Sequence, residues 1–542
     1  MNSRLHSSKL YKMLRATILS LLILIPQYLK AQIAPAEDRV LNYRIIGFSI
    51  PQEQKVANYT LEIAAGNYNS EDSFKKNIIN TLHSKTNKII AEVPSFGSAY
   101  TWRVVYAFSK SSKTITALFH FNTGKIPEVD TNITRLRITK AALEYDSAYV
   151  FLDDNKTLYD MNGRPVWYLP KIEGFPITPR DLKLSPQGTI TFMYDPPYEI
   201  NYNGDVLWKA PQKGIVSGDD AEHFHHEFTR LANGHYMVLG EDSVLWRPDR
   251  PSSKGNNPDK QINKEANSAS DKKLQFGTLI EYDEQGNVTW SWKSADYFAA
   301  SDLKYFTPPG DNPGIDVHEN AFYFDEKNKN IYISFKNISR VLKVKYPEGT
   351  VINTYGEIYK PGVPQTGTGL FCGQHACKLS DSGYLYLYDN NTCDSGQLPK
   401  IVMMKEPGSE NEGLKIIWEY DCTIKGKKTE ELKNDFISGG NVMELSDHNI
   451  FACMNGSSYC KIFIVNKDKK KLWSARPERW DETTKKWYPV SQYRASIIEN
   501  RKDLERLIWN AELPDKQINT AVVTAVPVKH PDFIIKPVSG TH

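Results

Sequence analysis

A repeated unit occupies the sequence from about residue 138 onward, and it constrains the fold more than any other feature. The unit is a short strand, a polar turn and a second strand that ends in an aromatic or apolar residue. Its six copies end at or near Trp167, Trp208, Trp290, Asn353, Trp418 and Trp473. Asn-Gly and other glycine-containing turns within the copies favour β-hairpins.

A second strand element precedes five of these copies and begins at Arg180, His226, His318, His375 and Gly440. Two hairpins per unit give four antiparallel strands, which is one blade of a β-propeller. The repeat therefore predicts an all-β fold with a six-bladed β-propeller over residues 136–542. We expect the polar insertion at 250–273 to be a surface loop. We also expect a charged helix at 494–507 and a strand at 518–526 that closes the ring.

Residues 35–130 form a separate module in the sequence, ahead of a linker at 127–132. Alternating strand patterns appear at 59–63, 88–93, 100–108 and 115–121. The last two resemble the final strands of fibronectin-type-III-like domains. This pattern predicts a small immunoglobulin/fibronectin-III-like β-sandwich in front of the propeller.

The first 31 residues have the pattern of a secretory signal peptide. Basic residues come first, an apolar stretch follows at 16–29, and Pro26 interrupts it. We expect export to the periplasm, cleavage after Ala31 and no stable membrane insertion afterwards; an uncleaved membrane anchor is the alternative. Residues 1–31 carry five basic and no acidic residues, so cleavage lowers the net charge from +3 to −2. A nearly neutral chain without a basic stripe argues against nucleic-acid binding.

All six cysteines lie between residues 372 and 460. In an exported protein, such cysteines favour disulfides. The short spacings predict the pairs Cys372–Cys377 and Cys453–Cys460, which leaves Cys393 and Cys422. A zinc site is less favoured because no CxxC spacing repeats.

The five strand starts named above carry the functional prediction. In a propeller the first strand of each blade lines the centre, so Arg180, His226, His318, His375 and Gly440 should surround one end of it. Several imidazoles beside cations, without paired carboxylates, favour an anionic group such as sulfate or phosphate over a glycoside. A structural role for the histidines, a metal site built from them, and a non-catalytic propeller that binds glycans or partner proteins remain open.

Three motifs resemble the bacterial aryl-sulfate sulfotransferases. They are H-H-E-F-x-x-L-x-N-G at 225–234, D-V-H-E-N at 316–320 and Q-H-A-C-K-L-x-D-x-G-Y-L-Y-L-Y-D-N-N at 374–391. The resemblance implies a periplasmic six-bladed propeller behind a small β-domain. It also implies ping-pong transfer of a sulfuryl group from a phenolic sulfate ester to a phenol. No cofactor, and in particular not the nucleotide donor PAPS, would be needed. A homodimer is left open.

The resemblance also implies roles for individual residues. His375 would be the nucleophile that is transiently sulfated, and His226 and His318 would complete the catalytic group. Asn320 would bind sulfuryl oxygens. Lys336 stands where the family has an arginine, and keeps the charge without the bidentate geometry. The remaining residues expected to bind substrate are His225 and Arg180.

Overall fold

The computed structural model describes residues 33–172, 179–246, 272–298, 316–356, 370–392, 398–408, 413–424, 436, 438–456 and 458–511. The signal segment at 1–31, the strand expected at 518–526 and nearly all of the loop expected at 250–273 lie outside these residues. The prediction of an all-β chain is confirmed, because antiparallel strands make up most of the described structure. None of the helices in this part of the chain is long and apolar enough to span a membrane.

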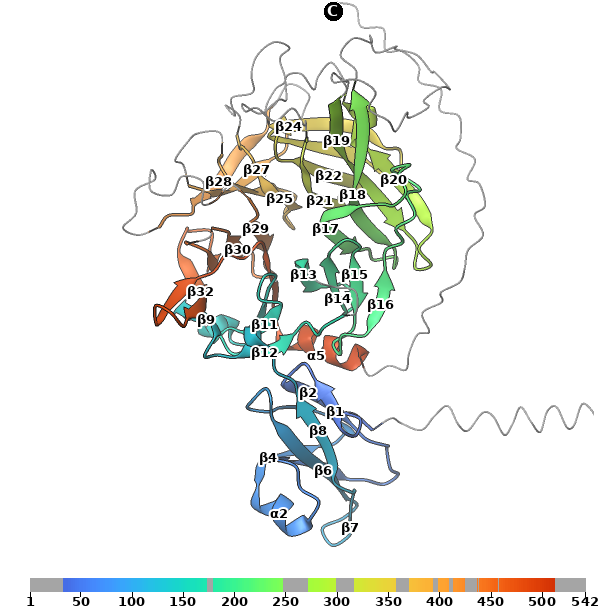
Figure 1. The fold of residues 1–542 in the computed structure, drawn as a ribbon, viewed down its shortest axis with the longest axis vertical. Helices are drawn as coiled ribbons and strands as arrows, with labels where there is room; N and C mark the ends of the chain where they lie inside the picture. Colours follow the sequence, from blue (N-terminus) through green and yellow to red (C-terminus); the bar gives the residue numbers. More distant parts are fainter. Residues whose placement is uncertain are drawn as a thin grey trace, which may run out of the picture.

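Two sheets form the N-terminal module (Figure 1). The larger has the order β1 (Arg39–Leu41), β8 (Phe119–Thr123), β6 (Ala99–Ala107), β3 (Asn58–Ala65) and β4 (Ile78–Ser84), and β7 (Lys113–Ile115) pairs with β6. The smaller pairs β2 (Ile45–Ser49) with β5 (Lys88–Glu92), and the short helix α2 (Glu71–Lys76) joins β3 to β4. Phe48 of β2 packs edge-on against Trp102 of β6, with ring centroids 5.0 Å apart, so the two sheets share a core.

Six further sheets follow one another around a common centre (Figure 1). Their strands, from the centre outward, are listed here. The first sheet contains β34 (Ala495–Ile498), β10 (Tyr149–Leu152), β11 (Thr157–Asp160) and β12 (Pro165–Tyr168). The second contains β13 (Arg180–Leu184), β14 (Ile190–Met193), β15 (Tyr198–Ile200) and β16 (Val206–Lys209). The third contains β17 (Phe224–Arg230), β18 (Tyr236–Trp246), β19 (Lys272–Tyr282) and β20 (Val288–Lys293), and the one-turn helix α3 (Ser294–Tyr297) follows it.

The other three sheets continue the same pattern. The fourth contains β21 (Glu319–Asp325), β22 (Asn330–Phe335), β23 (Arg340–Lys345) and β24 (Thr350–Gly356). The fifth contains β25 (His375–Leu379), β26 (Leu385–Asp389), β27 (Lys400–Lys405) and β28 (Lys415–Asp421). The sixth contains β29 (Asn441–Glu444), β30 (Ile450–Met454), β31 (Lys461–Val465), β32 (Lys471–Asp481) and β33 (Lys486–Pro489), and β9 (Thr134–Lys140) also pairs with β32.

Consecutive sheets meet at their first strands. β34 contacts β13, and the contacts continue from β13 to β17, β21, β25 and β29. The strand elements predicted to line the centre are therefore the ones that do so. Each presents the start of its strand to the same end of the ring, which is where the predicted functional residues lie.

Four of the tryptophans that end the sequence repeats tie their sheet to the next. The indole N–H of Trp167 donates to the carbonyl of Tyr202 at 2.7 Å, and that of Trp290 to Pro347 at 2.8 Å. Trp418 and Trp473 donate in the same way to Lys467 and Met161, at 2.8 and 3.0 Å. A buried indole needs a partner for its N–H. The turn of the neighbouring sheet supplies one, so the same residue fills the space between sheets and fixes their spacing.

The C-terminal part of the chain differs from its prediction. The helix expected at 494–507 is divided: residues 495–498 form β34, and α5 (Arg501–Asn510) begins only after the Asn500 cap. β34 pairs with β10 and adds the inner strand that the first sheet lacks. Residues 495–498 form a strand in spite of their helical pattern, because pairing with the edge of β10 gives them a full ladder of hydrogen bonds.

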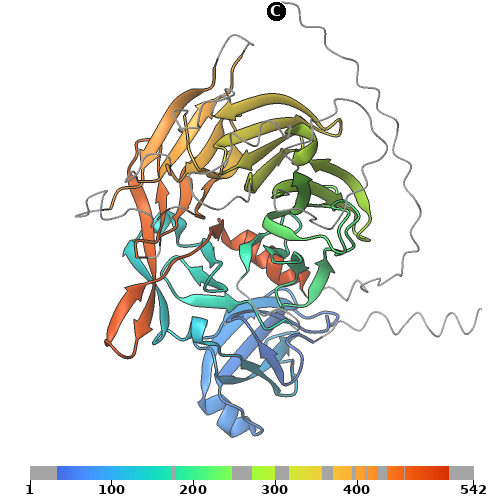
Figure 2. The same cartoon turned by 45° about the horizontal axis from the view of Figure 1, so that its top comes forward.

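The N-terminal module and the ring share one hydrophobic core. Ile45 and Phe48 belong to the same buried cluster as Trp167 and Leu507. Figure 2 shows α5 between the ring and the N-terminal module. A Cβ at Gly47 would lie 2.8 Å from Ile508, so the helix packs directly on the backbone of β2.

Both predicted disulfides are wrong. Cys377, Cys453 and Cys460 are buried free thiols, as is Cys422. Cys377 lies within β25, where alternation directs its side chain into the sheet interior. The thiols of Cys453 and Cys460 do lie within hydrogen-bond reach of each other, but no covalent bond joins them. Burial accounts for the placement of the four thiols.

Candidate active site

The three histidines singled out by the repeat (the site histidines, His226, His318 and His375) converge at the centre of the ring. The rings of His226 and His318 are nearly perpendicular, with centroids 4.9 Å apart. The rings of His226 and His375 both face Tyr493, at 6.1 and 6.4 Å between centroids. The strand starts thus bring together side chains that are up to 149 residues apart in the sequence.

The backbone at these strand starts is strained. The φ angles of Asp181, His226, His318 and Ala376 are +55°, +58°, +54° and +51°. Non-glycine residues in this left-handed region cost on the order of 1–3 kcal/mol each. Four such residues lie at one end of the ring. This clustering indicates that the fold accepts a strained backbone there because it directs the neighbouring side chains to the centre.

His375 is fully buried, and its two nitrogens have distinct partners. The backbone N–H of Gly439 donates to Nε2 at 3.2 Å, so Nε2 carries a lone pair. Nδ1 therefore carries the hydrogen and donates it to Oδ1 of Asn390 at 2.7 Å. Asn390 is held in turn, because its Nδ2 donates to the carbonyls of Phe436 and Gly439.

His318 has a carboxylate partner in place of an amide. Nδ1 of His318 lies 2.9 Å from Oδ2 of Asp316, and the backbone N–H of His318 donates to Oδ1 of the same residue at 2.6 Å. Burial by itself raises the pKa of Asp316, but the hydrogen bonds from His318 outweigh it and the pKa is lowered. Asp316 is therefore ionised and orients the imidazole.

Two of the site histidines are held neutral. Burial, together with the neighbouring Lys336, lowers the pKa of His375 well below its usual range. Burial, with His225 and His318, does the same to the pKa of His226. A neutral imidazole with one unprotonated ring nitrogen is a nucleophile or a base near neutral pH.

The residues expected to bind substrate lie at or near the site histidines. Lys336 follows β22, is half-buried, and donates its backbone N–H to the carbonyl of His318 at 2.9 Å. Burial lowers the pKa of Lys336. Asn320 is fully buried; its Nδ2 donates to the carbonyl of Gln374 at 2.7 Å, while Oδ1 has no partner. Arg180 lies over the ring of Tyr493, 4.4 Å from its centroid.

His225 is placed differently from the expectation that it binds substrate. Its Nε2 lies 3.1 Å from the carbonyl oxygen of Gly240, and its Nδ1 lies 2.9 Å from Nδ1 of His226. Both ring nitrogens are thus engaged within the protein. His225 stands behind His226, because an irregularity in β17 turns the two neighbouring side chains toward each other.

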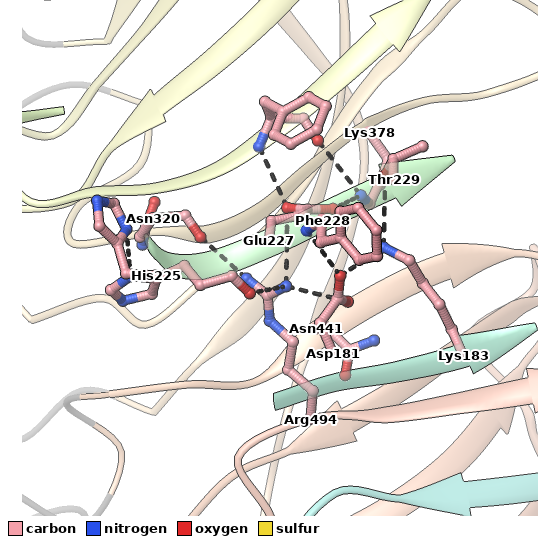
Figure 3. A network of polar contacts seen from close by, with 12 residues as sticks. Asp181, Lys183, His225, Glu227, Phe228, Thr229, Asn320, Lys378, Asn441 and Arg494 are labelled. Carbon is pink, nitrogen blue, oxygen red and sulfur yellow. Dashed lines mark hydrogen bonds and ion pairs between the residues drawn. The ribbon is translucent and has the colours of Figure 1, made fainter. Parts of the chain in front are cut away.

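Arg494 joins the inner strands below the site and was missed by sequence reasoning (Figure 3). Its guanidinium donates to the carbonyls of His226 and Asn320, at 3.2 and 2.9 Å. It also lies 3.2 Å from Asp181 and 3.7 Å from Glu227. Burial by itself lowers the pKa of Arg494, but these carboxylates outweigh it and raise the pKa.

Glu227 extends the same network to the fifth sheet, since Lys378 of β25 pairs with it (Figure 3). Arg494 and Tyr493 directly precede β34, which the sequence pattern had assigned to a helix. The number of repeats could have revealed this strand. The sequence has six hairpin copies but only five inner-strand elements, so a further strand must complete the first sheet.

The site histidines do not form a compact metal-binding group among the described residues. Within that part of the chain, the groups whose ligand atoms lie within 4.8 Å of one another are Glu37–Asp38–His120 and Asp381–Glu444–His448. Both lie outside the ring centre and at least two of their three residues are exposed. The geometry therefore gives no support to the metal-site alternative at His226, His318 and His375.

The sequence model of the arylsulfotransferase family matches residues 146–416, half of the chain, and that range contains all three site histidines. The chain belongs to the arylsulfotransferase family. No curated protein matches this chain.

Solved structures resemble this chain only distantly. A protein of unknown function from Bacteroides caccae is 13% identical over 66% of this chain and 99% of its own, with a TM-score of 0.34. A periplasmic gluconolactonase of Pseudomonas aeruginosa is 10% identical over 82% of this chain and 99% of its own, with a TM-score of 0.28. Similarity at this level establishes no shared function.

A cavity of about 840 Å³ lies away from the site histidines, between the N-terminal module and the ring. Arg44, Phe96, Lys125 and Arg164 are among its lining residues. Arg44 is bound to the carbonyls of Val93 and Pro165, and Lys125 pairs with Asp130. The charged groups of this cavity thus serve the junction between the two parts.

Proposed function

We propose that the protein transfers a sulfuryl group from a phenolic sulfate ester to a phenolic acceptor, through a sulfohistidine at His375 and without PAPS or another cofactor. The family membership supports a sulfotransferase of aryl substrates. The observation that carries the proposal is the set of hydrogen bonds around His375, which leaves a neutral imidazole with its lone pair on Nε2. The non-polar face of Tyr493 between His226 and His375 suits an aryl group.

In the first half-reaction, Nε2 of His375 attacks sulfur. The N–S bond forms as the bond between sulfur and the aryl oxygen breaks, and the phenolate leaves with the electron pair. Nδ1–H of His375 keeps its hydrogen bond to Oδ1 of Asn390. Because this amide is neutral, it stabilises the cationic sulfohistidine without cancelling its positive charge. The N–H of Gly439, freed from Nε2, then stands beside the sulfuryl oxygens.

In the second half-reaction, the acceptor phenol loses its proton to Nε2 of His318 or His226, and its oxygen attacks sulfur. The S–N bond breaks and its electrons return to His375. Asp316 accepts the Nδ1–H of His318, which leaves Nε2 of that ring to take the proton. This proton passes to solvent, and solvent supplies the proton that the donor phenolate takes up, so the overall reaction balances. Lys336 and Arg180 offset the negative charge of the sulfuryl group, and Asn320 binds its oxygens.

The test is acceptor-dependent release of nitrophenol from 4-nitrophenyl sulfate by the full-length protein with phenol as acceptor. We expect turnover with ping-pong kinetics, and a mass increase of one sulfuryl group on the His375 peptide after incubation with donor alone. Both should vanish in His375→Ala and persist in His448→Ala, which changes an exposed histidine outside the ring centre.

Several outcomes would contradict the proposal. Turnover retained in His375→Ala would remove His375 as the nucleophile. Activity abolished by a chelator would favour a metal-dependent enzyme. Absence of turnover with every aryl sulfate tried would favour a propeller that binds glycans or partner proteins.

The proposal includes the architecture and location that accompany this activity. We assign the six consecutive sheets to six propeller blades and the N-terminal module to an immunoglobulin/fibronectin-III-like sandwich. Their support is the strand order and the first-strand contacts. The signal-like segment at 1–31 supports export to the periplasm, without stable membrane insertion once it is cleaved. Sedimentation of the mature protein would distinguish a monomer from a homodimer.

A further inference from the structure

The first observation is an irregular stretch of β17. Phe224 pairs with Gly240 and Phe228 with Val238, so three residues of β17 (225–227) face one residue of β18. In a regular strand, adjacent side chains point to opposite faces. Here the bulge and the φ of +58° at His226 bring the imidazoles of His225 and His226 together, with centroids 5.0 Å apart and planes at 86°.

The direction of each hydrogen bond follows from the partners. The carbonyl of Gly240 can only accept, so Nε2 of His225 carries a hydrogen. Burial, and the nearby His318, lower the pKa of His225 to about 4, so its Nδ1 is unprotonated near neutral pH. Nδ1 of His226 must then donate across the 2.9 Å that separates the two atoms.

We propose that His225 is a positioning residue, which accepts the Nδ1–H of His226 and thereby keeps the lone pair of His226 on Nε2, the nitrogen that serves sulfuryl transfer. This inference rests on the proposed function for its catalytic consequence, but not for its structural content. All three site histidines then share one tautomer, with Nδ1 bound by Asn390, Asp316 or His225.

The charged and titratable groups that act on His225 from outside β17 come from two segments. His318 and Asp316 belong to the segment that enters β21, and Asp195 lies in the turn before β15. The effects of the two carboxylates on His225 oppose that of His318, so the neutral state of His225 depends on its burial beside β18. A polar but non-titrating residue should therefore replace His225 only if it presents an acceptor at the position of Nδ1.

The experiment compares His225→Asn, His225→Leu and the control His223→Leu in the full-length protein. Asn can place Oδ1 where Nδ1 stood, whereas Leu offers no acceptor. His223 is exposed and pairs with Asp195, outside the site. The first readout is the ¹⁵N chemical shift of the His226 ring nitrogens, which reports the tautomer directly.

We expect a single tautomer with Nδ1–H in the native protein, in His225→Asn and in His223→Leu, and a mixture of both tautomers in His225→Leu. The kcat for sulfuryl transfer should fall about tenfold or more in His225→Leu with little change in KM, and recover in His225→Asn. An unchanged His226 signal in His225→Leu would overturn the proposal, as would equal loss of kcat in both His225 variants. If the tautomer shifts as expected but the native protein shows no transfer, the positioning role stands and the proposed function fails.

Discussion

Single residues at the ring centre decide what the site can do, and Lys336 is the clearest case. It stands where the sequence resemblance predicts an arginine, and no carboxylate forms an ion pair with it among the described residues. Its charge is one cause of the lowered pKa of His375. Under the proposed function, Lys336 acts both on the sulfuryl charge and on the nucleophile.

Replacing Lys336 tests both effects. In Lys336→Met, removal of the cation stabilises the imidazolium form, so the pKa of His375 rises and the acid limb of the kcat–pH profile moves to higher pH. Loss of one cation beside the developing charge should also lower kcat by about 10²-fold. Lys336→Arg should keep the position of the acid limb, and Lys327→Met, in an exposed turn, should change neither. An acid limb that stays in place in Lys336→Met would contradict the electrostatic coupling.

Glu319 is a buried carboxyl without a partner, next to His318 in sequence. It is 2% exposed, neither carboxyl oxygen has a hydrogen-bond partner, and burial raises its pKa to about 8. The folded protein therefore holds a proton there that the unfolded chain releases near its ordinary pKa. The stability that this proton confers is complete at acidic pH and is lost as pH rises toward 8.

The variant Glu319→Gln should remove this dependence. Between about pH 4.5 and 8, the native protein should lose up to about 1.4 kcal/mol of unfolding free energy per pH unit through this group. The slope should be smaller in Glu319→Gln, measured by denaturant unfolding at several pH values. Parallel profiles for the two proteins would show that Glu319 is ionised in the folded state.

At the scale of strands, the closeness of the inner strands requires a glycine at one strand start. Gly440 precedes β29 with a φ of +86°, and a Cβ there would lie 2.2 Å from the ring of Tyr388. Its N–H also donates to the carbonyl of Tyr493 at 2.8 Å. β29 can approach both β26 and the closing segment only because no side chain intervenes.

We expect Gly440→Ala to destabilise the protein by about 2–3 kcal/mol or more, since it combines backbone strain with overlap against a ring. Gly383→Ala is the matched control. Gly383 also has a positive φ, of +80°, but a Cβ there meets nothing within 4 Å, so only strain of about 1 kcal/mol remains. Equal losses in the two variants, by denaturant unfolding, would show that the Tyr388 contact is unimportant.

How far the sequence predicts this protein depends on whether the signal is periodic. The inner strands at Arg180, His226 and His375 follow from the repeat, and so does the convergence of the three histidines. β34 breaks the period because its partner, β10, is 343 residues away at the paired Ala495 and Leu152. Tyr493 and Arg494, which that strand brings in, were invisible for the same reason. The bulge that brings His225 against His226 is likewise a tertiary feature, set by the ladder to β18.

One hydrophobic cluster spans the N-terminal module and the first two sheets of the ring. Leu507 of α5 is fully buried in the cluster that contains Ile45 and Phe48 of the N-terminal module and Trp167 of the ring. The buried Arg44 adds a hydrogen bond to the carbonyl of Pro165 at 2.9 Å. These contacts predict that the described N-terminal module and the ring unfold together.

Leu507→Ala tests this coupling. A large-to-small change at a buried leucine should cost about 2–5 kcal/mol. In calorimetry, the native protein should show a single transition, and the variant a single transition at lower temperature. Two transitions, of which only one shifts, would show that the parts unfold independently.

The closing strand also governs when, during its synthesis, the protein acquires its activity. A ribosome delivers His226, His318 and His375 long before it delivers Tyr493 and Arg494, because polypeptides are made from the amino end. Until then the first sheet lacks its inner strand, and Asp181 and Glu227 lack the guanidinium that joins them. The nascent chain therefore contains the three site histidines before Tyr493 and Arg494 can align them. Under the proposed function, sulfuryl transfer begins only after β34 has been synthesised and has paired with β10.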